Sequence, residues 1–287
     1  MSCHASPGSP GRPTRVAALT LLLGTLFLGA EAASIVVAPT AVYIDHQTRS
    51  AEVVLFNPSD VAEEVTVEAV FGYPATRDDG SLYLELEEDS TNPRSAASWI
   101  RPFPRRMIIQ PGARQVVRLL GEPPADLPDG EYWTRLVFTA RGQSLPVSAS
   151  AGSPPVRVGL DLEVRTIIAA TYRKGTVDTG LEVSDLDPRV EADTLHLRPL
   201  LVRRGSAAWI GAFHLRLLLA NGAEVRGWQE QVAVYDRYHR AFAYPLEGLP
   251  AGTYTLEARL TTRRDDVPAG FRLAAPDWTQ SVSVRVP

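Results

Sequence analysis

The sequence predicts an all-β protein built of two β-sandwich domains that follow an N-terminal signal peptide. Two observations support this fold class. From residue 33 to the end, short segments carry apolar residues at every second position, separated by turns rich in Pro, Gly, Asn and Asp. That pattern is typical of sandwich strands. In addition, no stretch shows a convincing apolar stripe of helical period.

Composition and charge limit the function classes. The chain has 287 residues, of which 45% are hydrophobic and 22% are charged. This is a globular composition, and the length suits about two domains. The formal net charge is −4, so we expect no nucleic-acid partner, because such partners favour basic surfaces.

Residues 1–32 predict a cleaved signal peptide. Arg12 and Arg15 precede an apolar run over residues 16–30, and Ala30-Glu31-Ala32 provides a small-residue cleavage site. A signal anchor is the alternative, but the run is shorter than the ~20 residues of a membrane span. We therefore expect export to the periplasm and no membrane insertion of the mature chain. The single cysteine, Cys3, would leave with the signal, so the mature chain would have no thiol and no disulfide.

The first domain is expected over residues 33–173. Strand alternation over residues 50–56 and 64–71 flanks the turn Asn57-Pro58-Ser59-Asp60, and residues 132–138 alternate after Pro128-Asp129-Gly130. Residues 141–155 are polar and small, which predicts a mobile loop.

The second domain is expected over residues 174–287, with the boundary near residues 172–175. Its clearest feature is Asn221-Gly222 between two alternating segments, residues 213–219 and 224–235. Asn-Gly at this place is among the strongest hairpin signals.

A strand over residues 156–169 is the most informative segment. One face carries an unbroken apolar row: Val156, Val158, Leu160, Leu162 and Val164. The ordinary interpretation is a strand with one face in its own core. The sharper one is that this row completes the sheet of another protein by strand addition, because a long exposed edge is otherwise an aggregation hazard.

Several segments, taken in order, resemble the N-terminal domain of the periplasmic pilus-assembly chaperones (PapD-like), a family with two immunoglobulin-like domains. They lie at residues 37–43, 49–53, 57–59, 102–104, 111–119, 127–133 and 172–173. The most specific part is Pro-Gly-x-x-Gln-x-x-Arg from Pro111, followed by Leu-Pro-Asp-x-Glu from Leu127. The resemblance implies that the chain caps a secreted pilin-like subunit by donor-strand complementation, with an outer-membrane usher as a further partner. The unbound chain would be a monomer.

The chain departs from the family pattern at the site that would bind the subunit's terminal carboxylate. The resemblance implies an arginine and a lysine there, but the matching positions are Thr40 and Ala169. Arg165, Arg173 and Lys174 lie close in sequence and are candidate replacements, although a shift of one residue reverses the face of a strand. A non-chaperone structural or adhesive envelope protein of the same fold is therefore the alternative function.

We expect neither an enzyme nor a cofactor or metal. Nucleotide-loop, zinc-protease and Gly-x-Ser-x-Gly motifs do not occur. Acidic residues 185–193 could bind calcium, but they lack the Gly and distal Glu of a calcium loop. Aromatic residues of the second half could form a binding face or simply a core; they are Trp209, Trp228, Tyr235, Tyr238 and Tyr244.

Overall fold

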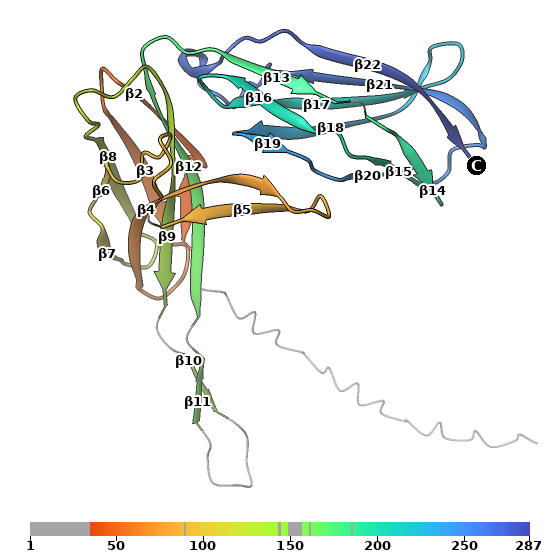
Figure 1. The fold of residues 1–287 in the computed structure, drawn as a ribbon. Coiled ribbons are helices and arrows are strands. Elements are labelled where there is room, and N and C mark those ends of the chain that lie inside the picture. Colours follow the sequence, from red (N-terminus) through yellow and green to blue (C-terminus); the bar gives the residue numbers. More distant parts are fainter. Residues whose placement is uncertain (1–34, 89, 143–144, 149–156, 161, 185) are drawn as a thin grey trace, which may run out of the picture. The chain divides into compact units, whose positions relative to one another are not determined.

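The computed structural model describes residues 35–88, 90–142, 145–148, 157–160, 162–184 and 186–287 (Figure 1). The predicted signal peptide, residues 1–32, lies outside the described residues. Apart from a short 3₁₀ helix, η1 (Ala269–Phe271), the described elements are all strands. Within these residues, no helix is long and apolar enough to cross a membrane.

The first sandwich packs two sheets against each other. One sheet has the order β1 (Val36–Ala38), β3 (Ser50–Phe56), β8 (Arg114–Gly121) and β6 (Ile100–Phe103). The other has the order β2 (Ala41–Asp45), β12 (Glu163–Lys174), β9 (Gly130–Arg141), β4 (Glu63–Thr76) and β5 (Leu82–Glu87), with β7 (Arg106–Ile109) also paired to β4. Alternate residues of both sheets meet in one buried core that includes Leu55, Val117, Leu136, Phe138 and Tyr172.

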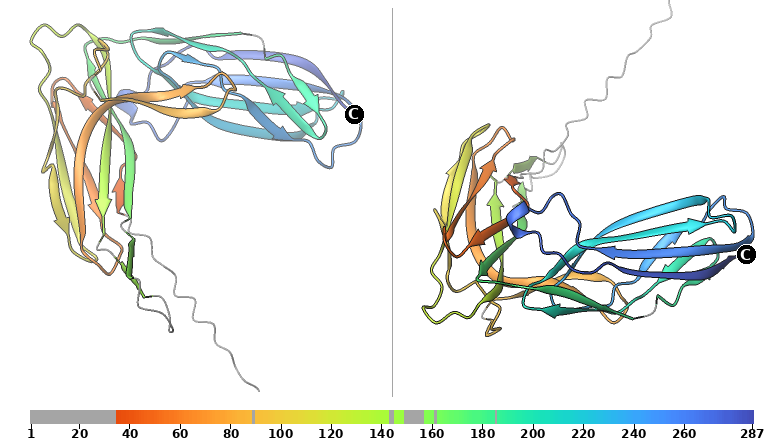
Figure 2. Two further views of the ribbon diagram at one scale, coloured as in Figure 1. Left: turned by 60° about the horizontal axis from the view of Figure 1, so that its bottom comes forward. Right: turned by 90° about the horizontal axis from the view of Figure 1, so that it is seen from above.

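The second sandwich has its own core. A four-stranded sheet has the order β18 (Glu224–Val234), β17 (Trp209–Leu218), β21 (Gly252–Thr261) and β22 (Trp278–Val286). Two smaller sheets have the orders β13 (Thr179–Val183), β16 (Leu201–Gly205), β19 (Arg237–Tyr238), and β14 (Arg189–Glu191), β15 (Thr194–Leu197), β20 (Phe242–Pro245). Side chains from all three sheets share one buried cluster, and the strands can be followed in Figure 2.

The predicted fold class, all-β with two immunoglobulin-like sandwiches, is confirmed. The hairpin predicted from Asn221-Gly222 joins β17 to β18, and Gly222 has a φ of 82°, as such a turn requires. Trp209, Tyr238 and Tyr244 belong to the core of the second sandwich, so for these three aromatic residues the core interpretation is correct.

One loop prediction is wrong in part. Within residues 141–155, predicted as a loop, the structure places β10 (Leu145–Ser148), which pairs antiparallel with β11 (Arg157–Leu160). Both strands lie beyond Arg141, where β9 ends, so they pair with each other instead of extending the main sheet.

Candidate partner-binding edge

β12 is paired along both edges for only part of its length. All of it pairs antiparallel with β9. On the opposite edge, β2 runs parallel to it and pairs with residues 169–173. Among the described strands, none pairs with this edge at residues 163–168. We call residues 163–168 the open edge.

The open edge exists because the first strand of the chain changes sheets. β1 pairs with β3 in one sheet, and after Pro39 and Thr40 the chain continues as β2 in the other. β2 is parallel to β12, so only residues before Ala41 could have covered the open edge. Of the described residues before Ala41, Val36–Ala38 pair with β3 in the opposite sheet.

A hydrogen bond fixes which backbone groups of the open edge point outward. The Ala169 N–H donates to the Thr40 carbonyl at 3.4 Å, so residue 169 directs its amide toward the side of β2. Successive residues of a strand direct their backbone groups to opposite edges. Arg165 and Ile167 therefore present their N–H and C=O groups on the open edge, whereas Thr166 and Ile168 direct theirs toward β9. Unpaired groups of this kind are a template for a further strand.

Side chains on the two faces of the open edge differ. Ile168 lies in the core of the first sandwich, and Val164, on the same face, is half-buried. On the other face, the exposed Glu163 carboxylate binds Arg141 Nη2 at 2.7 Å and Arg165 Nε at 2.8 Å. Ile167, which follows on the same face as Glu163 and Arg165, is half-buried.

The predicted donor row is divided between two strands. Val156 lies outside the described residues. Val158 and Leu160 belong to β11, with Val147 and Leu145 of β10 as their backbone partners. Leu162 lies between the strands and is 45% exposed, and Val164 belongs to β12. The single strand predicted over residues 156–169 is therefore wrong in its bounds, because β11 pairs with β10 and β12 pairs with β9.

The two positions of the expected carboxylate site lie side by side. Thr40 and Ala169 share the hydrogen bond given above, but neither side chain is a cation. Lys174 Nζ donates to the Leu127 carbonyl. Arg165 is paired with Glu163 at the surface, and Arg173 is held in a buried ion pair. The structure thus places Arg165 alone of these three cations on the open edge.

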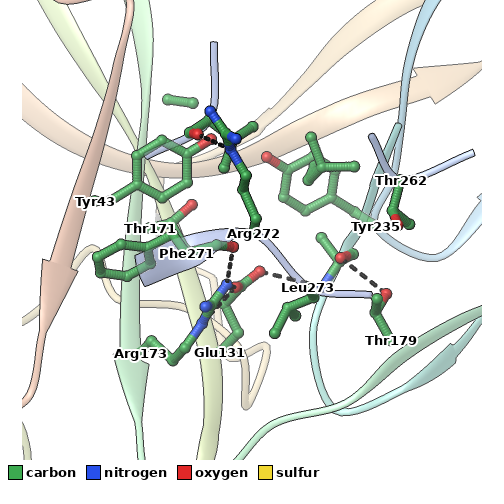
Figure 3. Close-up of a pocket in the computed structure, with 14 residues that line it drawn as sticks. Tyr43, Glu131, Thr171, Arg173, Thr179, Tyr235, Thr262, Phe271, Arg272 and Leu273 are labelled. Atoms are coloured by element: carbon green, nitrogen blue, oxygen red, sulfur yellow. Dashed lines mark hydrogen bonds and ion pairs between the residues drawn. The ribbon is translucent and has the colours of Figure 1, made fainter. Parts of the chain in front are cut away.

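Glu131 and Arg173 form the centre of a joint between the two sandwiches (Figure 3). Their side chains are 4% and 12% exposed, and Arg173 Nη2 lies 2.7 Å from Glu131 Oε2. The other carboxylate oxygen, Oε1, accepts hydrogen bonds from the Trp133 indole at 3.0 Å and from the Ala208 N–H at 3.1 Å. Arg173 Nη2 also donates to the Phe271 carbonyl at 3.1 Å. One ion pair therefore connects β9 and β12 to two segments of the second sandwich.

Aromatic side chains surround this ion pair. Phe71, Trp133 and Tyr235 form a small buried cluster with Ala208, and the ring centroids of Trp133 and Tyr235 are 5.0 Å apart. The Tyr43 ring lies 5.1 Å from that of Phe271, and burial raises the pKa of Tyr43 to about 12. Its phenol therefore stays neutral at physiological pH and bears no charge that could compete for Arg173.

A small cavity lies between these residues (Figure 3). Tyr43, Ala169 and Arg173 line it from the first sandwich, and Tyr235 and Phe271 line it from the second. Its volume is about 30 Å³, which is room for one or two water molecules.

Sequence reasoning used Glu131 only as the last residue of Leu-Pro-Asp-x-Glu, without giving it a role, and did not consider Phe271. A usable signal for Glu131 exists: it is a charged residue in β9, where nearly every side chain is buried. A charge in such a strand needs a buried partner. That partner, Arg173, follows 42 residues later, so spacing along the chain could not identify it.

The described residues include no group of three or more His, Cys, Asp or Glu side chains that could hold a metal ion. In the acidic segment, Asp185 lies outside the described residues, and Asp187 is paired with Arg189 at 2.8 Å.

Comparisons with known proteins give structural neighbours only. No protein-family model matches the chain. No curated protein matches it in sequence. Similar solved structures include the YadV chaperone, with 14% identity, a TM-score of 0.44 and coverage of 88% of this chain and 99% of that chain.

Two further neighbours are complexes. One is the CsuC–CsuE chaperone–tip adhesion subunit pre-assembly complex of Acinetobacter baumannii (14% identity, TM-score 0.41, coverage 87% and 98%). The other is the Salmonella enterica SafA pilin in complex with the SafB chaperone (14% identity, TM-score 0.41, coverage 87% and 97%). A chaperone is named in each of these three structures.

Proposed function

We propose that the chain is a periplasmic chaperone-like protein that binds a secreted pilin-like subunit by strand addition. The observation that carries the proposal is the open edge, residues 163–168, where Arg165 and Ile167 present unpaired backbone groups. An incoming strand would bind these groups in the manner of an added sheet strand. The function is binding and needs no catalytic residue or cofactor.

The apolar row supplies specificity in this proposal. Leu162 is exposed and Val164 is half-buried, next to the open edge. Val156, Val158 and Leu160 continue the row along the chain. A subunit sheet that lacks one strand exposes apolar pockets and unpaired backbone groups, and a row with a period of two fits such a groove. The subunit is thereby kept from aggregating until it is transferred, with an outer-membrane usher as the acceptor.

Arg165 is the candidate contact for the subunit's terminal carboxylate. It lies on the open edge, and its partner Glu163 belongs to an exposed pair, which solvent screens and which therefore adds little stability. Arg165 could therefore leave Glu163 and bind the terminal carboxylate of the subunit at little cost in free energy. Arg173 and Lys174 are less suited, because both are held by other groups of the chain.

A structural or adhesive envelope protein is the second candidate. Thr40 and Ala169 favour it, because the resemblance implies cations at these positions. In that case the open edge would carry no subunit, and the protein would be recovered without a partner.

Two variants at one residue test strand addition. Arg165→Pro removes an outward N–H without removing a hydrogen bond to β9, and Arg165→Ala keeps that N–H while removing the side chain. Proline is tolerated where the N–H of an edge strand faces outward. Each full-length chain, with an affinity tag, is expressed in its own host, recovered from the periplasm and analysed by mass spectrometry.

The wild type is expected to recover a small secreted subunit at near one to one. Arg165→Ala should retain part of this yield and Arg165→Pro should lose it, with both chains folded by circular dichroism. Equal recovery by Arg165→Pro and Arg165→Ala would refute strand addition at this edge. Recovery of the wild type alone would favour the envelope-protein function. The unbound chain is expected to be a monomer at low concentration.

A further inference from the structure

A second unpaired edge lies on β5, at the opposite end of the same sheet from β2 (Figure 1). β5 pairs with β4, and no other described strand pairs with it. Three leucines on one of its faces are exposed: Leu82 is 46% exposed, Leu84 is 37% and Leu86 is 39%. Three exposed leucines on a free edge form the kind of strand that soluble proteins normally avoid.

The opposite face of the β4–β5 hairpin is occupied. Tyr73 and Tyr83 lie on that face, and the Tyr73 ring is 6.3 Å from Tyr235 in the joint. At the tip of the hairpin, Gly80 accepts a hydrogen bond from the Ala241 N–H at 2.9 Å. The leucine face is therefore the face of β5 that is left for another molecule.

Pro74 fixes the direction of the backbone groups of β5. Leu84 lies opposite Pro74 of β4, and proline has no N–H to donate. In an antiparallel pair, residues at alternate positions exchange both hydrogen bonds and the others direct theirs away. Leu84, and with it Leu82 and Leu86, thus directs its N–H and C=O to the free edge.

The sequence of β5 is complementary to itself. When two copies are set antiparallel with Leu84 facing Leu84, Leu82 faces Leu86 of the second copy. On the other face, Glu85 then faces Tyr83 and Glu87 faces Ser81. Within β5 itself, no two carboxylates meet. A shift that centres the pair on Glu85 sets two carboxylates against each other, and one that centres it on Tyr83 leaves Leu86 opposite Gly80, without a leucine partner. Like charges directly opposite are unfavourable.

We propose that two copies of this chain pair through β5, antiparallel and centred on Leu84, so that the two sheets join into one. Leu84 is placed to exchange both backbone hydrogen bonds with its counterpart. β5 is only six residues long, which is short for the ~1,200 Å² that a standard stable complex buries. The dimer is therefore weak and forms at high protein concentration, while the dilute chain is a monomer.

Cysteine cross-linking tests the pairing and its register. In the full chain with Cys3→Ser, Leu84→Cys places two thiols opposite each other at the ~5.5 Å Cα separation of such a pair, within disulfide range. Leu82→Cys and Leu86→Cys are the matched controls, because each would be about 13 Å from its own counterpart at ~3.3 Å per residue.

Under mild oxidation, Leu84→Cys is expected to form a covalent dimer, whereas Leu82→Cys and Leu86→Cys alone are not. A mixture of the two control chains, carrying different tags, should form the mixed dimer. Cross-linking of Leu84→Cys no faster than of Leu82→Cys would overturn the proposal. The proposal would also be overturned if the Leu84→Glu variant sedimented like the wild type at high protein concentration. It would likewise be overturned if Leu84→Glu still dimerised and lost only the binding of a different protein.

Discussion

Replacing Glu131 by Gln should destabilise the protein strongly through the joint between the sandwiches. In the native chain, Oε2 faces the Arg173 guanidinium, with contacts of 2.7 and 3.2 Å, and Oε1 accepts from Trp133 and Ala208. The amide of Gln can keep one acceptor oxygen only. If that oxygen stays with Trp133 and Ala208, the NH₂ group faces Arg173, and a nearly buried cation loses its counter-ion.

The expected loss is about 3–5 kcal/mol, the usual cost of breaking a buried ion pair on one side. For a protein of this size, each kcal/mol corresponds to about 2–4 °C in Tm, so the melting temperature should fall by on the order of 10 °C. The matched control is Glu163→Gln, which breaks two exposed ion pairs and should change the melting temperature little, because solvent screens exposed pairs.

Scanning calorimetry on both variants measures the difference. Because Glu131 joins the two cores, its variant should also separate the unfolding into two transitions. Arg173→Met and the double variant complete the cycle, and the double variant should cost less than the sum of the single ones. Equal melting temperatures of Glu131→Gln and Glu163→Gln would refute the assignment of the ion pair as the main polar link of the joint.

Two further changes act elsewhere in the first sandwich. Glu63 is fully buried, neither of its carboxylate oxygens accepts a hydrogen bond from the described residues, and burial raises its pKa. A carboxyl group whose pKa is raised in the folded state makes the protein less stable as pH rises above the pKa of that group in the unfolded chain, so the stability of Glu63→Gln relative to wild type should increase from about pH 4 to pH 7. Urea titrations at the two pH values measure this, and a constant difference would contradict it. Gly80 has a φ of 82°, and a Cβ there would lie 2.6 Å from the Ala241 nitrogen. The Ala241 N–H donates to the Gly80 carbonyl, so Gly80→Ala should accelerate hydrogen exchange of the Ala241 amide. The amides of the two cores should stay protected. An unchanged exchange rate at Ala241 would count against this contact.

Alternation along the chain was sufficient to predict strands but not their partners. Residues 50–56 and 64–71 alternate on either side of a turn, and both segments contribute strands, β3 and β4. The turn does not make a hairpin, because β3 and β4 belong to different sheets. Asn57 holds it there by donating to the Val61 and Ile109 carbonyls at 2.7 and 2.9 Å, a long-range contact that a local pattern does not encode.

The same limit applies to the candidate site. The apolar row from Val156 is visible in the sequence, but its division between β11 and β12 depends on where β9 ends, and that end is set by pairing. The open edge depends on β1 and β2 joining different sheets at Pro39 and Thr40. Such a change of sheet has no periodic signature, since both strands alternate in the same way.

Hydrogen exchange at the open edge tests the central claim most directly. In the free protein, the amides of Arg165 and Ile167 should exchange rapidly, and those of Thr166 and Ile168, which point toward β9, should exchange slowly. In the complex recovered with the secreted subunit, Arg165 and Ile167 should become as protected as their neighbours. Exchange of these two amides at the same rate in the complex as in the free protein would contradict strand addition at this edge.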